Sequence, residues 1–243
     1  MSARAGAKAA ANAKAASTPV RRNEPNWKER FANERSGWFL RALAYRRAPV
    51  CLPGRSIVLA AGRLVPQKGF DRLIEAFANI HGDHPNWDLV ILGAGPDRQV
   101  LEIQRDKLGL NGRVFLPGRA GNVADWYGRA SIFAMASLFE GFPNALLEAM
   151  AYGLPVISTD CDTGPRDLIE HDANGLLVTQ GDQSALIAGL RQLMDNEDLR
   201  SRLSQNARAV IQKFAVERIS RQWYAVFDGI GCNRQLISDR PSE

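Results

Sequence analysis

Short apolar runs alternate with helical patterns along most of the chain. Each run is apolar throughout instead of alternating with polar positions, as is typical of strands covered on both faces. The order predicts an α/β fold with a doubly wound parallel sheet, whose ligands bind beyond the carboxyl ends of the strands. The expected strands are residues 56–61, 88–92, 114–116, 132–136, 155–158 and 176–178, and the expected helices are 71–81, 98–108, 123–129, 144–152 and 165–170.

From Gln183 onward the pattern is helical, with apolar residues three and four positions apart. That spacing places them on one face of each helix, which we interpret as a packing surface. These residues are Leu186, Leu190, Leu193, Met194, Leu199, Leu203, Ile219, Trp223 and Phe227.

The pattern also divides the chain. We expect residues 1–24 to form a disordered basic arm, 25–54 a linker or helical segment, 55–230 the folded domain and 231–243 a flexible tail. No stretch approaches the roughly 20 apolar residues of a membrane-spanning helix. Residues 25–50 mix aromatic and charged side chains, which fits an amphipathic helix on a membrane surface or a linker helix packed on the body. Gly37 and the mixed charges favour the linker.

Charge and cysteines narrow the function classes. The formal net charge is +5, and residues 1–22 carry five bases and no acid, so 26 bases face 26 acids in the rest. A neutral body lacks the positive field of a nucleic-acid-binding protein. The composition of the basic arm favours a solvated segment over an organellar transit sequence.

The three cysteines are far apart in the sequence and form no C-x-x-C pair, which predicts reduced thiols and a cytoplasmic setting. They are Cys51, Cys161 and Cys232.

Two glycine-containing loops follow expected strands. The loop from Gly62 to Gly69 places Arg63 and Lys68 five residues apart, just before a helix. Two cations near a helix N-terminus suit a diphosphate, although solvated loop cations are the common alternative. The second loop, at 92–96, contains a Gly-x-Gly pair that a tight turn explains better than a ligand. Arg98 stands where a dinucleotide-binding loop would need its third glycine, which disfavours dinucleotides.

The most informative segment runs from residue 139 to residue 158. Pro143 is placed to start a helix, with Glu140 before it and Glu148 about 7.5 Å along the axis. We expect the free N–H groups of Phe142 and of residues 144–146 to point at an anion, and the carboxylates to accept from hydroxyls on either side of it. A nucleotide sugar has that layout. The alternative is that the helix dipole simply stabilises acidic side chains near the start of the helix. This explains Glu140 better than Glu148.

Residues 57 to about 227 resemble the C-terminal, donor-binding half of a GT-B glycosyltransferase of family 4, the retaining glycosyl transferases group 1 family. Within that family the chain is similar to bacterial exopolysaccharide and lipopolysaccharide transferases of the amylovoran type. The matching motifs are GRL with KG at 62–69, LGAGP at 92–96, E-x7-E at 140–148, GLPV at 153–156, GPR at 164–166 and NGLLV at 174–178.

The resemblance implies a role for each matching residue. Arg63 and Lys68 would hold the donor diphosphate and stabilise the departing charge, and Glu140 would address the sugar ring. Glu148 would accept from the ribose hydroxyls, and residues 116–119 would border the nucleobase. The donor would be a UDP- or GDP-sugar, with no metal and no cofactor. The implied donor-binding residues are Gly62, Gly93, Gly95, Leu116, Gly118, Arg119, Gly141, Phe142, Pro143, Asn144, Ala145, Leu146 and Glu148.

The resemblance has two departures. Asp167 follows Gly-Pro-Arg where the family often has Glu, and too few residues precede the first matching strand for the N-terminal acceptor domain. The sequence therefore predicts a retaining hexosyltransferase half that is truncated, or that needs a separate N-terminal half. The alternative is a non-catalytic nucleotide-sugar-binding module. The expected acceptor is a glycan or a lipid-linked sugar. We expect a cytoplasmic location, with at most peripheral attachment to the inner face of the membrane.

Overall fold

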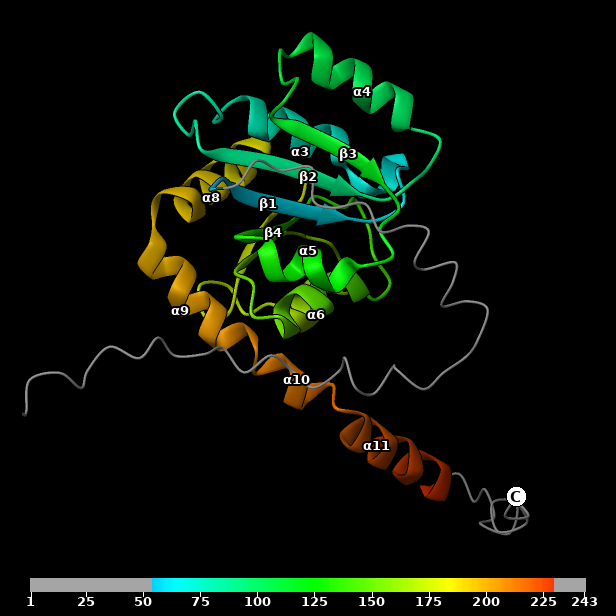
Figure 1. Ribbon diagram of the computed structural model, residues 1–243. Coiled ribbons are helices and arrows are strands. Elements are labelled where there is room, and N and C mark those ends of the chain that lie inside the picture. Colours follow the sequence, from blue (N-terminus) through cyan, green and yellow to red (C-terminus); the bar gives the residue numbers. More distant parts are fainter. Residues whose placement is uncertain (1–53, 230–243) are drawn as a thin grey trace, which may run out of the picture. The chain divides into compact units, whose positions relative to one another are not determined.

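The computed structural model describes residues 54–229, which contain a six-stranded, all-parallel sheet. The strand order is β3-β2-β1-β4-β5-β6 (Figure 1), so the fold expected from the apolar runs is confirmed. The strands are β1 (Ser56–Ala61), β2 (Trp87–Leu92), β3 (Val114–Gly118), β4 (Ile132–Met135), β5 (Val156–Asp160) and β6 (Leu176–Thr179).

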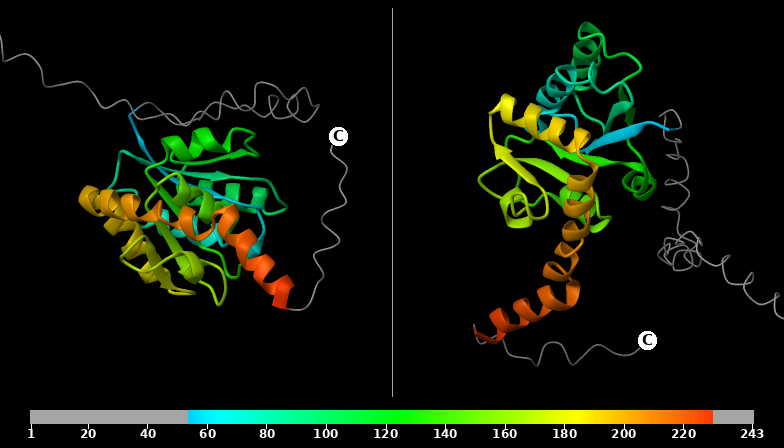
Figure 2. Two further views of the ribbon diagram at one scale, coloured as in Figure 1. Left: turned by 90° about the horizontal axis from the view of Figure 1, so that it is seen from below. Right: turned by 90° about the vertical axis from the view of Figure 1, so that its left-hand side faces the viewer.

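Helices cover both faces of this sheet (Figures 1 and 2). Helices α3 (Phe70–Ala78), α4 (Arg98–Lys107) and α8 (Gln183–Asp195) pack on one face, and α5 (Val123–Arg129), α6 (Asn144–Ala151) and α7 (Pro165–Leu168) on the other. Side chains of β1 alternate between the two layers: Val58 lies in the first core and Leu59 in the second. The continuous apolar runs follow from this double coverage.

The predicted elements agree closely with the observed ones. β1 and α5 have the predicted bounds, and the remaining strands and crossover helices differ by one to three residues at an end. β5, for example, continues to Asp160 because it pairs with β6 as far as Thr179. The predictions for residues 1–53 and 230–243 lie outside the described residues. They concern the arm, most of the linker, the tail, Cys51 and Cys232.

The C-terminal helices divide into a packed part and an exposed part. Helix α8 and helix α9 (Glu197–Ala207) bury the predicted apolar residues from Leu186 to Leu203 in the first core. The short helix α10 (Val210–Lys213) follows, and then α11 (Val216–Gly229), none of whose residues is buried.

The predicted packing surface on α11 is therefore wrong for the described part of the chain. Trp223 and Phe227 are 57% and 44% exposed and stack on each other, with ring centroids 5.7 Å apart. The physical reason is that α3 to α9 already cover both faces of the sheet, so no described element meets this side of α11. Among residues 54–229 no helix has the length and apolar character that crossing a membrane requires.

The loops after β1 and β2 touch backbone to backbone. The N–H of Gly62 donates to Leu92 O at 2.9 Å, and the N–H of Leu64 donates to Ala94 O at 3.1 Å. A Cβ on Gly93, whose φ is 142°, would lie 1.7 Å from Gly62 O, and one on Gly95 would lie 2.1 Å from Leu64 O. Both glycines are therefore required by this close approach, which supports the tight-turn interpretation of the loop.

We expect Gly93→Ala to lower the free energy of unfolding by about 3 kcal/mol, because the added Cβ meets a backbone oxygen that has no room to move. Gly128→Ala is the matched control, since a Cβ on this helical residue would meet nothing within 4 Å. It should be neutral or raise the stability by up to about 1 kcal/mol. Urea denaturation followed by circular dichroism measures both values, and equal effects would contradict the proposed backbone contact.

Candidate functional site

The candidate residues gather around the point where the strand order reverses. Strands β1 and β4 are neighbours, but the chain proceeds from β1 to β2 and β3 on one side and from β4 to β5 and β6 on the other. In open α/β sheets the loops that diverge at such a switch point leave a crevice in which ligands bind. The loop of Arg63 and Lys68 follows β1, and the loop of Glu140 follows β4.

The loop after β1 is fixed against the loop after β4. The 3₁₀ helix η1 (Pro66–Lys68) ends at Gly69, whose φ of 60° lies in the left-handed region. A Cβ on Gly69 would lie 2.1 Å from Ala136 O, so this position requires glycine. The N–H of Leu138 donates to Gln67 O at 2.8 Å, and Gln67 Nε2 donates to Phe139 O at 2.9 Å. These contacts hold Lys68 opposite the acidic end of the second loop.

Lys68 and Glu140 form a partly buried ion pair. Lys68 Nζ lies 2.6 Å from Glu140 Oε1, and the Glu140 side chain is 7% exposed. Ser137 Oγ donates to the same carboxylate oxygen at 2.6 Å, and Thr163 Oγ1 donates to Glu140 O. Oε2 of Glu140 has no hydrogen-bond partner among residues 54–229, so one oxygen of this carboxylate stays uncommitted.

Arg63 differs from Lys68 in its surroundings. Its side chain is exposed, and within the described part of the chain it has no ion pair or side-chain hydrogen bond. It therefore presents an uncompensated cation at the same loop. The structure brings Lys68 and Glu140 together, whereas Arg63 is left to reach an external group.

The N-terminus of α6 offers fewer free amides than expected. Pro143, with φ −83° and ψ 77°, forms an inverse γ-turn in which the N–H of Asn144 donates to Phe142 O at 3.0 Å. The N–H of Leu146 donates to Pro143 O at 3.0 Å. The prediction that these two amides are free is therefore wrong, because the turn closes them locally. The N–H groups of Phe142 and Ala145, as predicted, and that of Gly141 have no hydrogen-bond partner among the described residues.

The loop after β5 braces this turn from behind. A Cβ on Gly164 would lie 2.9 Å from Pro143 Cδ, and the Asp167 carboxylate accepts from the N–H of Gly164 at 3.2 Å. The shorter acid at position 167 is thus used within its own turn. Phe142 is exposed and packs edge-on against Phe214, with ring centroids 5.4 Å apart.

Glu148 lies farther along α6 and is exposed. Tyr127 Oη, from α5, lies 3.0 Å from Glu148 Oε2 and 3.2 Å from Ala145 O. Burial raises the pKa of Tyr127 far above its ordinary value, and the Glu148 charge raises it further. The phenol is therefore neutral near pH 7 and acts as a hydrogen-bond donor.

The loop after β3 contributes mainly backbone. The Leu116 side chain is buried in the first core, and Leu116 O accepts from Arg98 Nη2 at 2.7 Å. Gly118 O accepts from the N–H of Gly93 at 2.9 Å, which ties this loop to the one after β2. Arg119 is exposed. Residues 116–119 therefore stand beside the glycine loops, with the Arg119 side chain facing solvent.

Three residues of the site escaped sequence reasoning. Ser137 could have been suspected, because it is a polar residue directly after an apolar strand and three positions before Glu140. Thr163 and Tyr127 carried no such signal, because their contacts reach residues 23 and 21 positions away in the sequence.

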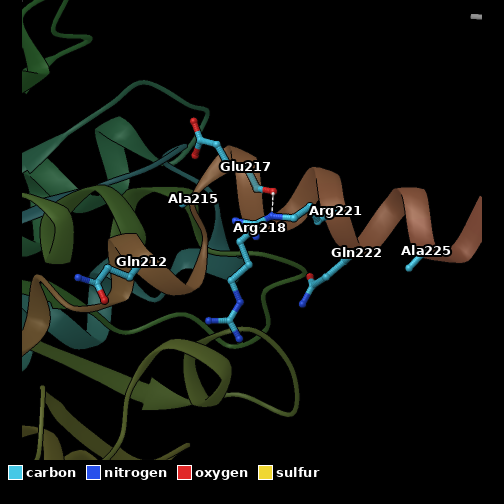
Figure 3. Close-up of a pocket in the computed structure, with 7 residues that line it drawn as sticks. All are labelled: Gln212, Ala215, Glu217, Arg218, Arg221, Gln222 and Ala225. Carbon is cyan, nitrogen blue, oxygen red and sulfur yellow. Dashed lines mark hydrogen bonds between the residues drawn. The ribbon is translucent and has the colours of Figure 1, made fainter.

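A surface hollow along α10 and α11 contains none of these candidates (Figure 3). Arg221 Nε donates to the backbone oxygen of Glu217 at 3.1 Å there, and the other polar groups face open solvent. We interpret the hollow as a solvated helix face. Its lining residues are Gln212, Ala215, Glu217, Arg218, Arg221, Gln222 and Ala225.

Residues 45–210 match the family described as glycosyl transferases group 1. The chain belongs to this family. A glycosyltransferase of amylovoran biosynthesis from Erwinia amylovora, AmsD, is 34% identical over 168 residues, which are 68% of this chain and 46% of AmsD. The chain thus spans about half the length of the curated relatives it matches.

Solved glycosyltransferases have the same architecture. TarM of S. aureus, crystallised with fondaparinux, α-GlcNAc-glycerol and UDP, superposes with a TM-score of 0.69 at 27% identity, covering 75% of this chain and 37% of TarM. The C-terminal domain of the group 1 glycosyltransferase LpcC from Francisella tularensis superposes with a TM-score of 0.62 at 29% identity, covering 67% of this chain and 87% of that domain. The described residues therefore form one Rossmann-like half of a GT-B fold.

We expect Lys68→Met to lower the free energy of unfolding by about 2 kcal/mol, because it leaves the Glu140 carboxylate buried without its cation. Lys68→Met combined with Glu140→Gln should recover part of the loss, since the uncompensated charge is gone. Arg191→Met, which breaks the exposed pair with Asp83, is the control and should change the stability much less than Lys68→Met, because solvent screens this pair. Chemical denaturation measures all three, and a double variant less stable than Lys68→Met would contradict the interpretation.

Proposed function

We propose that this chain is the donor-binding half of a retaining glycosyltransferase that transfers a hexose from a UDP- or GDP-sugar to a glycan or lipid-linked acceptor. The observation that carries the proposal is the Lys68–Glu140 pair beside the free amides of Gly141 and Ala145. It combines a cation, an uncommitted carboxylate oxygen and anion-binding amides at the switch point of the sheet. A diphosphate joined to a hydroxyl-rich sugar fits that combination.

The charged side chains of the site would act while the bond between sugar and diphosphate breaks. The bond between the anomeric carbon and a diphosphate oxygen breaks, and that carbon bonds to a hydroxyl oxygen of the acceptor. The hydroxyl proton passes to the departing phosphate, and negative charge grows on the nucleotide while the first bond breaks. Arg63 and Lys68 would stabilise that charge, together with the N–H groups at the start of α6. We propose that neither a metal nor a cofactor takes part. Such preorganised electrostatic stabilisation is often the largest contribution to catalysis.

The carboxylates of Glu140 and Glu148 would accept hydrogen bonds from hydroxyls at the two ends of the donor. Glu140 Oε2 would accept from the sugar ring, while its Oε1 stays bound to Lys68 and Ser137. Glu148 would accept from the ribose, and residues 116–119 would border the nucleobase. The UDP named with TarM supports a uridine nucleotide as the first donor to test.

Turnover would also require an acceptor held at the anomeric carbon, on the face from which the diphosphate leaves. Alignment of two substrates accounts for a large part of such a rate, and the residues described contain the donor side of the cleft. We propose that a separate N-terminal GT-B half completes the enzyme. The second candidate is a non-catalytic nucleotide-sugar-binding module, which would use the same Lys68–Glu140 pair to hold the donor.

Lys68→Ala and Glu148→Ala should each weaken the affinity for UDP by about 1 to 3 kcal/mol, as expected when a charged hydrogen bond is lost. Isothermal titration calorimetry measures the change. Lys107→Ala and Glu75→Ala remove the same charges at exposed positions of α4 and α3, outside the site, and should change the affinity less than twofold. Unchanged affinity in both site variants would refute the assignment.

Transfer separates the two candidate functions. The chain is mixed with UDP- or GDP-hexoses and an acceptor extract, with and without a separately expressed N-terminal GT-B half. We expect sugar transfer in the presence of that half and little without it, because half a cleft does not align two substrates. Donor binding without transfer under both conditions would instead support the binding module.

A further inference from the structure

Tyr127 is placed to control the orientation of Glu148. The side chain comes from the middle of α5, is 3% exposed, and packs against Phe133 and Tyr152, with ring centroids 6.0 and 5.3 Å away. This packing fixes the ring, so the position of its hydroxyl is set by the core. The hydroxyl reaches Glu148 Oε2 at 3.0 Å.

The single proton of Tyr127 has two acceptors within reach, Glu148 Oε2 at 3.0 Å and Ala145 O at 3.2 Å. The carboxylate is both nearer and charged, and hydrogen bonds to ionised acceptors are the stronger ones. The raised pKa of Tyr127 keeps that proton on the phenol at neutral pH. The hydrogen bond therefore runs from Tyr127 to Glu148.

Glu148 has no other constraint in the described part of the chain. It is exposed on α6, and no cation or second side chain binds its carboxylate there. A free glutamate on a helix surface samples several rotamers, and a ligand that selects one of them must offset the lost entropy. With Oε2 held by Tyr127, Oε1 is left for a ligand.

Helix α5 also connects two parts of the site. It begins at Val123, four residues after Arg119 in the loop proposed to border the nucleobase. The same short helix thus follows the base loop and carries the tyrosine that contacts the carboxylate proposed for the ribose.

We propose that Tyr127 is a positioning residue, which holds Glu148 so that its free carboxylate oxygen meets the ribose hydroxyls of the donor. The inference rests on the proposed function, because it assigns a role to a residue that supports Glu148. Tyr127 itself touches no substrate in this scheme. Its contribution passes through the carboxylate.

Tyr127→Phe keeps the ring and removes the hydroxyl, so we expect it to weaken UDP binding about 5- to 10-fold, the size of one charged hydrogen bond partly replaced by water. Tyr152→Phe is the matched control, because it makes the same change in the neighbouring ring, and it should alter affinity less than twofold. In a Glu148→Ala background, Tyr127→Phe should cause no further loss. An equal loss in both backgrounds would show a structural role and overturn the inference.

A second readout needs no nucleotide. Burial first and the Glu148 charge next raise the pKa of Tyr152, so releasing Glu148 by Tyr127→Phe should lower that pKa towards its ordinary value. Spectrophotometric titration of the phenols measures it, with Tyr152→Phe identifying the signal. An unchanged Tyr152 pKa would overturn the inference. If the wild-type chain binds neither UDP nor GDP, the proposed function fails, and this titration still decides whether Tyr127 holds Glu148.

Discussion

The ion pair between Lys68 and Glu140 joins the two loops on which the candidate site depends. Strands β1 and β4 are neighbours at the point where the strand order reverses, so the loops that follow them diverge where open α/β sheets bind ligands. The pair closes at 2.6 Å, because Gly69 lets the first loop approach Ala136 and Ser137 turns the carboxylate towards the lysine. Without that bridge, a buried acid and a loop cation would each need another partner.

The pair also shapes the charge that a ligand would meet. Glu140 compensates Lys68 in the ligand-free protein, so the uncompensated positive charge of the site lies on Arg63 and on the free amides at the start of α6. An arriving anion would therefore gain from Arg63 and the amides at once. Lys68 would remain at Glu140 Oε1, and sugar hydroxyls would donate to Oε2. A ligand that brings both an anion and hydroxyls satisfies every group, whereas a bare anion leaves Glu140 less well compensated.

The sequence predicted the fold closely, because parallel strands covered on both faces leave an unmistakable apolar run in each strand. It failed where structure depends on contacts beyond the local pattern. The apolar residues of α11 have the same spacing as those of α8, yet Trp223 is exposed. A periodic pattern does not show whether another element is present to cover it. The sequence predicts a free N–H at Asn144 because the residue starts a helix. In the structure this N–H donates to Phe142 O within the turn at Pro143. Tyr127 was missed because its contact with Glu148 spans 21 positions.

The donor side of the proposed cleft can be assembled from residues 54–229 alone. Its cations, amides and carboxylates come from loops after β1, β3 and β4 and from α6, all within one sheet. Its backbone is fixed by contacts among those same loops, such as the approach of Gly93 to Gly62. In the proposed function, the binding energy for a nucleotide sugar therefore comes from one set of loops. Alignment of an acceptor is a separate requirement, because a second substrate must also be held at the anomeric carbon. The proposed donor contacts thus all lie within one Rossmann-like half of a GT-B fold.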